Sequence, residues 1–202
     1  MKRLSLIRQQ LLASDPSLAA IISHIETVSL PVSKDPFSDL VEAIINQQLS
    51  EKAGRTIFTR FRASFPGAKL TPRRILARSD QSLRDVGISW SKVTYIKSLA
   101  EEVEKKRLRL ADLGALDDEA VITALTKVKG IGRWTAEMFL MFSLGREDVF
   151  SYGDLGLRRA MAKLYKFRDY PSTKQMEKIV TKWRPYRTIV ARMLWASLDA
   201  PE

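Results

Sequence analysis

Two glycines, Gly130 and Gly132, stand one residue apart in the stretch VKGIGRWTAEMFLMFS, directly before a strongly apolar run. Glycines at the start of a helix leave its first amide groups accessible, and the positive end of the helix dipole lies at the same place. Lys129 and Arg133 flank the pair and add positive charge. This arrangement favours the binding of an anion, and a phosphate is the best candidate.

An ordinary glycine turn is the alternative, and for a bare Gly-x-Gly it would be preferred. The wider pattern changes that balance, because Leu125, Val128, Ile131 and Ala136 are spaced to pack between two helices joined by a very short connection. The small side chain of Ala136 would let the two helices approach closely. We therefore interpret the stretch as a helix-hairpin-helix.

Asp154, at the start of DLGLRRAMAKLY, is the second residue that could do chemistry. A carboxylate at a helix N-terminus is stabilised by the helix dipole. From the residues alone, a simple N-cap is the preferred interpretation of this aspartate. Capping and catalysis are nevertheless compatible at one position.

The charge of the chain points to a polyanionic partner. Its 202 residues contain 34 Lys and Arg against 23 Asp and Glu, a formal charge of +11. Such a surplus favours nucleic acid over an anionic membrane, and a protein that is merely basic, without such a partner, is the alternative. The absence of cysteine excludes disulfides and thiolate-bound metals, and the single His24 cannot build a His-rich metal site.

The N-terminus makes a poor signal peptide, and no apolar stretch approaches the length that spans a membrane. We expect an intracellular protein. It would lie in the cytoplasm or nucleoid of a bacterium or archaeon, or in the nucleus of a eukaryote.

The elements that must position these residues are helical nearly throughout. Helical spacing of apolar residues is clearest at Phe37, Leu40, Val41, Ile44 and Ile45. Expected helix caps are Asp35 with Pro36 at N1, Ser50, Thr71 with Pro72 at N1, and Ser89. The best strand candidate, residues 26–32, contains Pro31, which argues against a central strand.

We therefore predict an all-α fold, a compact bundle of about ten helices in two lobes with a helix-hairpin-helix motif. Residues 1–202 would form a single domain. Its lobes would be residues 34–130 on one side and residues 1–33 plus 131–202 on the other.

Four segments in order resemble the helix-hairpin-helix DNA glycosylases, and among them the alkylbase group of the 3-methyladenine DNA glycosylase II type. The segments are FSDLVEAIINQQLSEKAGRTIFTRF, GISWSKVTYIKSLAEEV, VKGIGRWTAEMFLMFSLGREDVFSYGDLGLRR and KWRPYRTIVARMLW. The resemblance runs from about Asp35 to Trp195, which is most of the chain. It implies a partner, double-stranded DNA containing alkylated bases, and a protein that acts as a monomer.

The resemblance assigns Asp154 as the catalytic carboxylate, near a sugar that gains positive charge when the base leaves. Trp134 and Trp195 match family positions in the base pocket, and Tyr152 and Met138 are adjacent candidates. Core packing is the alternative for each of these four side chains. Many relatives carry an acid directly before the catalytic one, whereas this chain has Gly153.

The resemblance also assigns the DNA contacts. DNA-binding positions would be Gly130, Gly132, Lys129, Arg133, Thr135 and Ser50. Gln48 is the first candidate, and Leu49 the second, for a wedge that fills the gap left by a flipped nucleotide; a helix end with a buried leucine is the alternative. No cofactor is required, although the carbonyls of Thr126, Val128 and Ile131 could hold a structural Na⁺ or K⁺.

The function expected from the resemblance is a monofunctional glycosylase that excises alkylated purines in base excision repair. Bifunctional relatives use a lysine at the hairpin position that Trp134 occupies here, so no lyase activity is expected. Two alternatives stay open. One is a non-catalytic helix-hairpin-helix protein that binds damaged or bent DNA, and the other is a glycosylase for another lesion, such as a deaminated purine.

Overall fold

The computed structural model describes residues 2–24, 30 and 32–199. Within these residues every regular element is a helix, which confirms the all-α prediction. The strand candidate at residues 26–32 lies outside the described residues except for Leu30 and Val32, and neither of these two is in a strand. No helix in the described part of the chain combines the length and the apolar character needed to cross a membrane.

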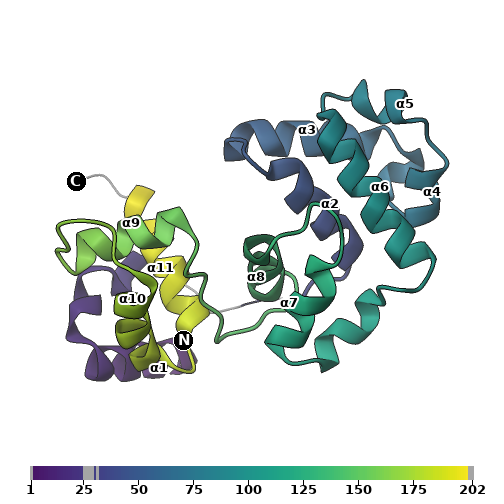
Figure 1. Ribbon diagram of the computed structural model, residues 1–202. Helices are drawn as coiled ribbons and strands as arrows, with labels where there is room; N and C mark the ends of the chain where they lie inside the picture. The colour runs from purple at the N-terminus through teal and green to yellow at the C-terminus, as the bar shows by residue number, and fades with distance from the viewer. Residues whose placement is uncertain (1, 25–29, 31, 200–202) are drawn as a thin grey trace. The chain divides into compact units, whose positions relative to one another are not determined.

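The chain divides into two compact units, coloured by residue number in Figure 1. Unit 1 contains residues 1–31 and 145–202, and unit 2 contains residues 32–144. The predicted lobe boundary after Gly130 is therefore displaced to Leu144. The reason is that the helix after the glycine turn packs against the helix before it, so the whole hairpin stays in unit 2.

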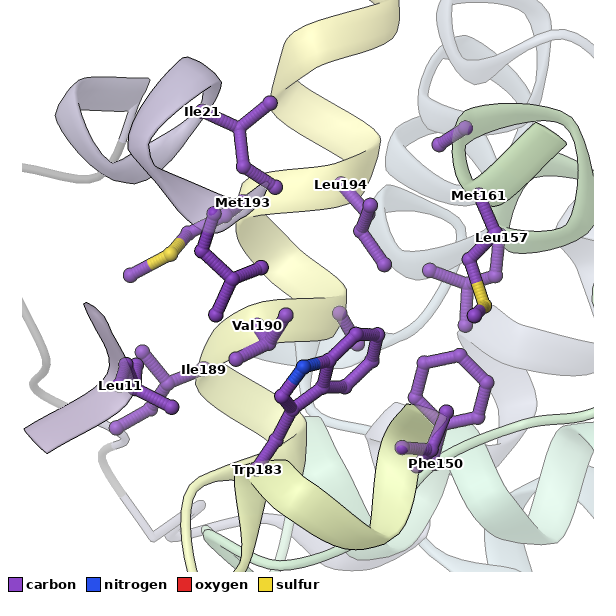
Figure 2. Packing of buried hydrophobic residues seen from close by; sticks show 14 of the residues in the cluster. Leu11, Ile21, Phe150, Leu157, Met161, Trp183, Ile189, Val190, Met193 and Leu194 are labelled. Atoms are coloured by element: carbon purple, nitrogen blue, oxygen red, sulfur yellow. The ribbon is translucent and has the colours of Figure 1, made fainter. Parts of the chain in front are cut away.

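Unit 1 brings the two ends of the chain into one bundle. Its elements are α1 (Lys2–Ser14), η1 (Pro16–Ala20), η2 (Ile22–His24), α9 (Leu155–Leu164), α10 (Thr173–Val180), η5 (Thr181–Trp183) and α11 (Arg187–Asp199). Figure 2 shows its core, where the indole of Trp183 meets the ring of Phe150 edge-on with centroids 5.7 Å apart. Apolar residues of α11, among them Val190 and Leu194, complete this core.

A buried carboxylate ties the N-terminal helices of unit 1 to its C-terminal part. The Oδ2 of Asp15 accepts hydrogen bonds from the hydroxyl of Tyr165 at 2.6 Å and from the indole of Trp183 at 3.1 Å. Burial, together with the bond to Asp15, raises the pKa of Tyr165 well above its usual value. The tyrosine therefore stays a neutral donor, and the buried carboxyl group of Asp15 has hydrogen-bond partners.

Unit 2 is built around α2 and α6. Its elements are α2 (Pro36–Asn46), α3 (Glu51–Ala63), η3 (Pro66–Ala68), α4 (Pro72–Leu76), α5 (Asp80–Arg84), α6 (Trp90–Glu104), η4 (Leu110–Ala115), α7 (Asp118–Thr126) and α8 (Arg133–Phe142). The helix α2 packs against α3, α6 and α8, and α7 packs against α8. The five apolar residues predicted to share one face of α2 are all buried.

The predicted N-caps are confirmed. The side chains of Asp35, Ser50, Thr71 and Ser89 each accept a hydrogen bond from a backbone amide in the first turn of the following helix. Each cap satisfies a donor that has no partner within its helix. The starts of these four helices are thus set by residues that the sequence already identifies.

Candidate active site and nucleic-acid interface

Asp154 lies at the N-terminus of α9 in unit 1. Its Oδ1 accepts a hydrogen bond from the amide of Leu157 at 2.7 Å, so the residue is the N-cap of this helix. The side chain is largely withdrawn from solvent, because only 9% of the residue is exposed. Helix dipole and amide donor together stabilise negative charge on this carboxylate.

Trp195 on α11 also reaches Asp154. Its indole Nε1 donates to the same Oδ1 at 3.0 Å, so this tryptophan orients the carboxylate as well as offering a ring. The indole is half-buried. The assignment of Trp195 as a simple pocket wall is therefore incomplete, because its polar edge is directed to the carboxylate.

Gly156 makes this contact possible, and sequence reasoning missed it. A Cβ at this position would lie 3.1 Å from Asp154 Oδ1 and 3.2 Å from two atoms of the Trp195 ring. The available signal was a glycine in the first turn of a helix, where glycine is otherwise unfavourable. The close approach of the indole to the start of α9 explains why glycine stands there.

Tyr152 lies in the same unit but packs on the core. Its ring meets Phe150 edge-on at 5.2 Å between centroids, and the side chain is partly buried against the unit 1 core. Of the two interpretations, core packing is the one that these contacts describe. Gly153 is exposed, and no atom lies within 4 Å of the position that its Cβ would take. Nothing in the structure therefore requires a glycine in place of the acid that many relatives carry here.

The hairpin of unit 2 joins α7 to α8. Leu125, Val128, Ile131 and Ala136 are all buried, as their spacing predicts. The helix α8 begins at Arg133, and its N-cap is Gly132, which has no side chain to bond the first-turn amides. The hairpin therefore presents a helix N-terminus without an internal side-chain cap, the arrangement that suits an external anion.

The two hairpin glycines have different structural causes. Gly130 has φ +90°, and a Cβ there would fall 2.1 Å from the Cγ of Tyr95. Glycine is thus required at 130 by the fold itself. Gly132 has an ordinary extended backbone, and nothing lies within 4 Å of its Cβ position. The fold does not explain this second glycine, whereas a close external approach to the backbone would.

Arg133 is exposed but already paired. Its guanidinium donates to Glu137 Oε1 at 3.0 Å and to Glu119 Oε2 at 3.1 Å. The hydrogen bond to Glu119 raises the pKa of Arg133, against the opposing effect of burial. The expectation that Arg133 adds free positive charge to the hairpin needs correction, because two carboxylates compensate it. Lys129 is exposed, as a phosphate ligand would be.

Thr135, another predicted DNA contact, points inward. The residue is 3% exposed, and its Oγ1 accepts a hydrogen bond from Gln47 Nε2 at 3.4 Å. Its hydroxyl is therefore a structural group, and only the backbone of this residue is placed to meet a ligand. The sequence could not separate the two roles, because both suit a small polar residue in the first turn of a helix.

The loop after α2 carries the wedge candidates. Gln48 is exposed and has φ +57°, a left-handed conformation that is uncommon for a residue with a side chain. Leu49 is 39% exposed, so it is not the buried leucine of the alternative interpretation. Strained, exposed residues of this kind cluster at ligand-binding sites.

Two residues that the sequence did not reveal hold this loop. Gln47 Nε2 donates to the carbonyl of Gly130 at 2.9 Å, which ties the loop to the hairpin. Lys92 Nζ donates to the carbonyls of Ile45 and Gln47, both at 2.8 Å. Burial lowers the pKa of Lys92. The loop and the hairpin are thereby one connected structure.

A depression of about 620 Å³ in unit 2 lies where these segments meet. The residues that line it are Gln47, Gln48, Leu49, Ser89, Ser91, Lys92, Tyr95, Gly130, Ile131 and Gly132. Hydroxyls, amides and an ammonium group therefore surround one hollow, which suits a polar, anionic ligand. Ser50 is not among these residues; it caps α3 and lines a separate groove with Lys52 and Thr56.

Trp134 and Met138 stand four residues apart on α8, so they share a face of that helix. Trp134 is 44% exposed and Met138 is half-buried. The indole of Trp134 is exposed, and the face of an indole ring can stack on a flat ligand. The predicted pocket residues are thus divided between the units, with Trp134 and Met138 in unit 2 and Asp154, Tyr152 and Trp195 in unit 1.

The chain is similar to several proteins whose names identify them as 3-methyladenine DNA glycosylases. DNA-3-methyladenine glycosylase 1 of Schizosaccharomyces pombe is 36% identical over 164 residues, covering 80% of this chain and 72% of the relative. The structure of a DNA-3-methyladenine glycosidase from Bacillus halodurans matches with a TM-score of 0.81 and 40% identity, over 94% of this chain and 87% of that one.

A 3-methyladenine DNA glycosylase of Schizosaccharomyces pombe, solved in complex with abasic DNA, matches with a TM-score of 0.83 and 29% identity, over 96% of this chain and 97% of that one. Residues 41–185 match the family described as HhH-GPD superfamily base excision DNA repair protein. This match includes the α2 loop, the hairpin and Asp154, and the chain belongs to the HhH-GPD superfamily of base excision DNA repair proteins.

Proposed function

We propose that this protein is a monofunctional DNA glycosylase that releases alkylated purines, of the 3-methyladenine type, from double-stranded DNA. The observation that carries the proposal is the Asp154 carboxylate, held at the N-terminus of α9 by the Leu157 amide and the Trp195 indole. The names of the relatives supply the substrate class. The depression and uncapped helix end of unit 2 supply a surface for the DNA backbone.

The proposed reaction breaks the bond between the sugar C1′ and the purine nitrogen. An N-alkylated purine is cationic, so it takes the bonding electron pair and leaves as a neutral base without needing a strong acid. Positive charge then develops on the sugar ring, and the fixed carboxylate of Asp154 stabilises it. Water adds at C1′ and loses a proton, which leaves an abasic site and the free base.

We assign recognition of the base to Trp134. The face of an indole attracts a cationic ring, and this one is exposed on α8. Met138, one turn along the same face, would pack beside it. Because the residue at this hairpin position is tryptophan and not lysine, no amine stands there to form a Schiff base with the sugar. The abasic strand should therefore stay intact until alkali or heat cleaves it.

We assign binding of the DNA backbone to the α8 amides together with Lys129. We assign to Gln48 or Leu49 the role of filling the gap left by the flipped nucleotide. The carbonyls of Thr126, Val128 and Ile131 could hold a monovalent cation beside the phosphate. Val128 O already accepts the Ile131 amide at 3.1 Å, but a carbonyl oxygen has a second lone pair for such an ion. The cation would add positive charge where the phosphate binds.

An enzyme of this kind works where DNA is, in the nucleoid or the nucleus.

The test is base release from methylated DNA by the wild type and by Asp154→Asn. Asparagine keeps the shape and the capping ability but removes the charge, so release should fall on the order of a hundredfold or more. Binding to a duplex with an abasic analogue should persist. Asp117→Asn is the matched control, because Asp117 caps α7 through the amide of Ala120 in the same manner.

Full activity of Asp154→Asn would refute the catalytic assignment. A wild type that binds damaged DNA but releases no base would favour the non-catalytic alternative. Release of a deaminated purine with no release of 3-methyladenine would favour the other lesion class. Strand cleavage before alkali would refute the absence of lyase activity.

A further inference from the structure

The charge surplus of the chain is concentrated away from the hairpin. Residues 55–84 contain eight Lys and Arg and one acidic residue, Asp80. Asp80 is itself paired with Lys97. The hairpin, by contrast, has Arg133 compensated by Glu119 and Glu137. The segment from α3 to α5 is therefore one of the regions of the chain with a large surplus of positive charge.

Three arginines of this segment converge on the loop at η3. Arg62 Nε donates to the carbonyl of Ala68 at 2.9 Å, and Arg74 Nη1 donates to the carbonyls of Pro66 and Lys69 at 2.8 and 2.9 Å. Arg78 Nη1 donates to the carbonyl of Ser64 at 2.8 Å. Backbone carbonyls hold these guanidiniums in place without cancelling their charge, and each keeps further N–H donors.

Two exposed side chains, Lys69 and Arg73, add to the three anchored arginines. We call these five residues, Arg62, Lys69, Arg73, Arg74 and Arg78, the basic face. Within the described part of the chain, none of the five forms an ion pair with a carboxylate, and the Lys69 and Arg73 side chains make no hydrogen bond. Guanidiniums that are held in place and form no ion pair are suited to phosphate oxygens, although the charge of Arg62 also acts on Glu42.

The basic face lies apart from the hairpin within unit 2. The helix α4 packs against α6, whereas α8 packs against α2 and α7. In Figure 1, α6 runs between α4 and α8. Phosphates bound at the basic face would therefore belong to DNA outside the stretch that the hairpin holds.

We propose that the basic face is a second contact for the sugar–phosphate backbone of DNA, outside the stretch bound by the hairpin. The inference rests on the proposed function only in taking DNA as the partner. Its contacts are with phosphates, so it contributes affinity that is independent of sequence and of damage. Such a contact would keep the protein on DNA while it searches for a lesion.

The test compares two double variants that make the same change in net charge. Lys69→Glu with Arg73→Glu reverses the charge of the two exposed residues of the basic face whose side chains hold no loop in place. Lys174→Glu with Lys178→Glu is the control, on exposed residues of α10 in unit 1. Binding is measured by fluorescence anisotropy at several salt concentrations. The probes are an undamaged duplex of about four helical turns and an abasic-analogue duplex of about one turn, roughly 10 base pairs.

For the long duplex, the basic-face variant should lose about tenfold or more in affinity, and its slope of log affinity against log salt should shrink by about 2. The short duplex should lose much less. The control variant should show a small loss that is alike for both lengths. Thermal unfolding, and the neutral pair Lys69→Gln with Arg73→Gln, verify that the effect is one of charge and not of folding.

Equal losses for the basic-face and control variants on the long duplex would show that only net charge matters, and would overturn the proposal. Equal losses on both duplex lengths would place these residues in the hairpin's own contact, with the same consequence. Unchanged DNA affinity with reduced binding of polyglutamate would favour an acidic protein instead. If the wild type releases no base but its DNA affinity depends on duplex length and salt as expected, the proposed glycosylase activity is refuted. The proposal that the basic face binds DNA is then still supported.

Discussion

The N-termini of α9 and α8 show two uses of the same helix feature. At α9, the side chain of Asp154 accepts the Leu157 amide, so the helix end is capped from within and the carboxylate is fixed. At α8, the N-cap is Gly132, which supplies no side-chain acceptor. One helix end uses its dipole to hold an internal anion, and the other is open to an external one. The N-cap residue decides between these two roles.

The largest effect is expected from giving α8 the cap that α9 has. In Gly132→Asp, a carboxylate would accept the first-turn amides and repel DNA phosphate. Affinity for an abasic-analogue duplex should fall about a hundredfold, while the free energy of unfolding should be retained or should rise by up to about 1 kcal/mol. Duplex titrations and urea denaturation measure the two quantities.

Gly132→Asn separates the two causes, because asparagine caps a helix without carrying charge. It should lose less affinity for DNA than the aspartate variant. The affinity that it does lose measures how far a side chain at this position keeps the phosphate away from the backbone. Unchanged DNA affinity in both variants would show that the α8 amides do not contact DNA. The contrast drawn between the N-termini of α8 and α9 would then be wrong.

The next effect concerns Gly130, which the fold itself requires. Gly130→Ala places a Cβ against the Tyr95 ring at positive φ. The free energy of unfolding should fall by about 2 kcal/mol, roughly thirtyfold in the folding equilibrium. Urea denaturation followed by tryptophan fluorescence measures this loss. Gly132→Ala is the control and should cost less than about 1 kcal/mol; equal losses would contradict the different causes assigned to the two glycines.

A smaller effect is expected at the α9 end from Gly156→Ala. The new methyl group would crowd Asp154 Oδ1 and the Trp195 ring, so the carboxylate should shift and base release should slow about tenfold. Single-turnover release from methylated DNA measures the rate. Gly153→Ala is the control, in the turn that precedes α9, where the Cβ position is empty. If both alanine variants were equally active, the contact between Trp195 and Asp154 would not matter for catalysis.

The smallest effect is expected from Gln48→Ala. If this side chain fills the gap left by the flipped nucleotide, excision from duplex DNA should slow several-fold, and excision of an unpaired lesion should slow less. Alanine retains the strained positive φ, whereas Gln48→Gly relieves it, so similar rates for the two variants would exclude backbone strain as the cause. An identical loss on duplex and unpaired substrates would make Gln48 a structural residue.

Local chemistry made much of the fold predictable. The caps at Asp35, Ser50, Thr71 and Ser89, and the buried face of α2, follow from residues within a few positions of one another. The lobe boundary was misplaced because the end of a packing unit depends on contacts between helices. The spacing of Leu125, Val128 and Ala136 predicted the α7–α8 pairing, but the sequence did not show that α8 would also pack on α2.

The same distinction between local pattern and tertiary contact applies to the candidate site. The sequence by itself determined the glycine hairpin, the aspartate at a helix start and the positive charge of the chain, because each depends on residue type and short spacing. Only the tertiary structure decided that Trp195 bonds Asp154, that Gln47 reaches the hairpin 83 positions away, and that carboxylates compensate Arg133. These contacts join side chains whose separation in space has no relation to their separation in sequence, so no local pattern encodes them.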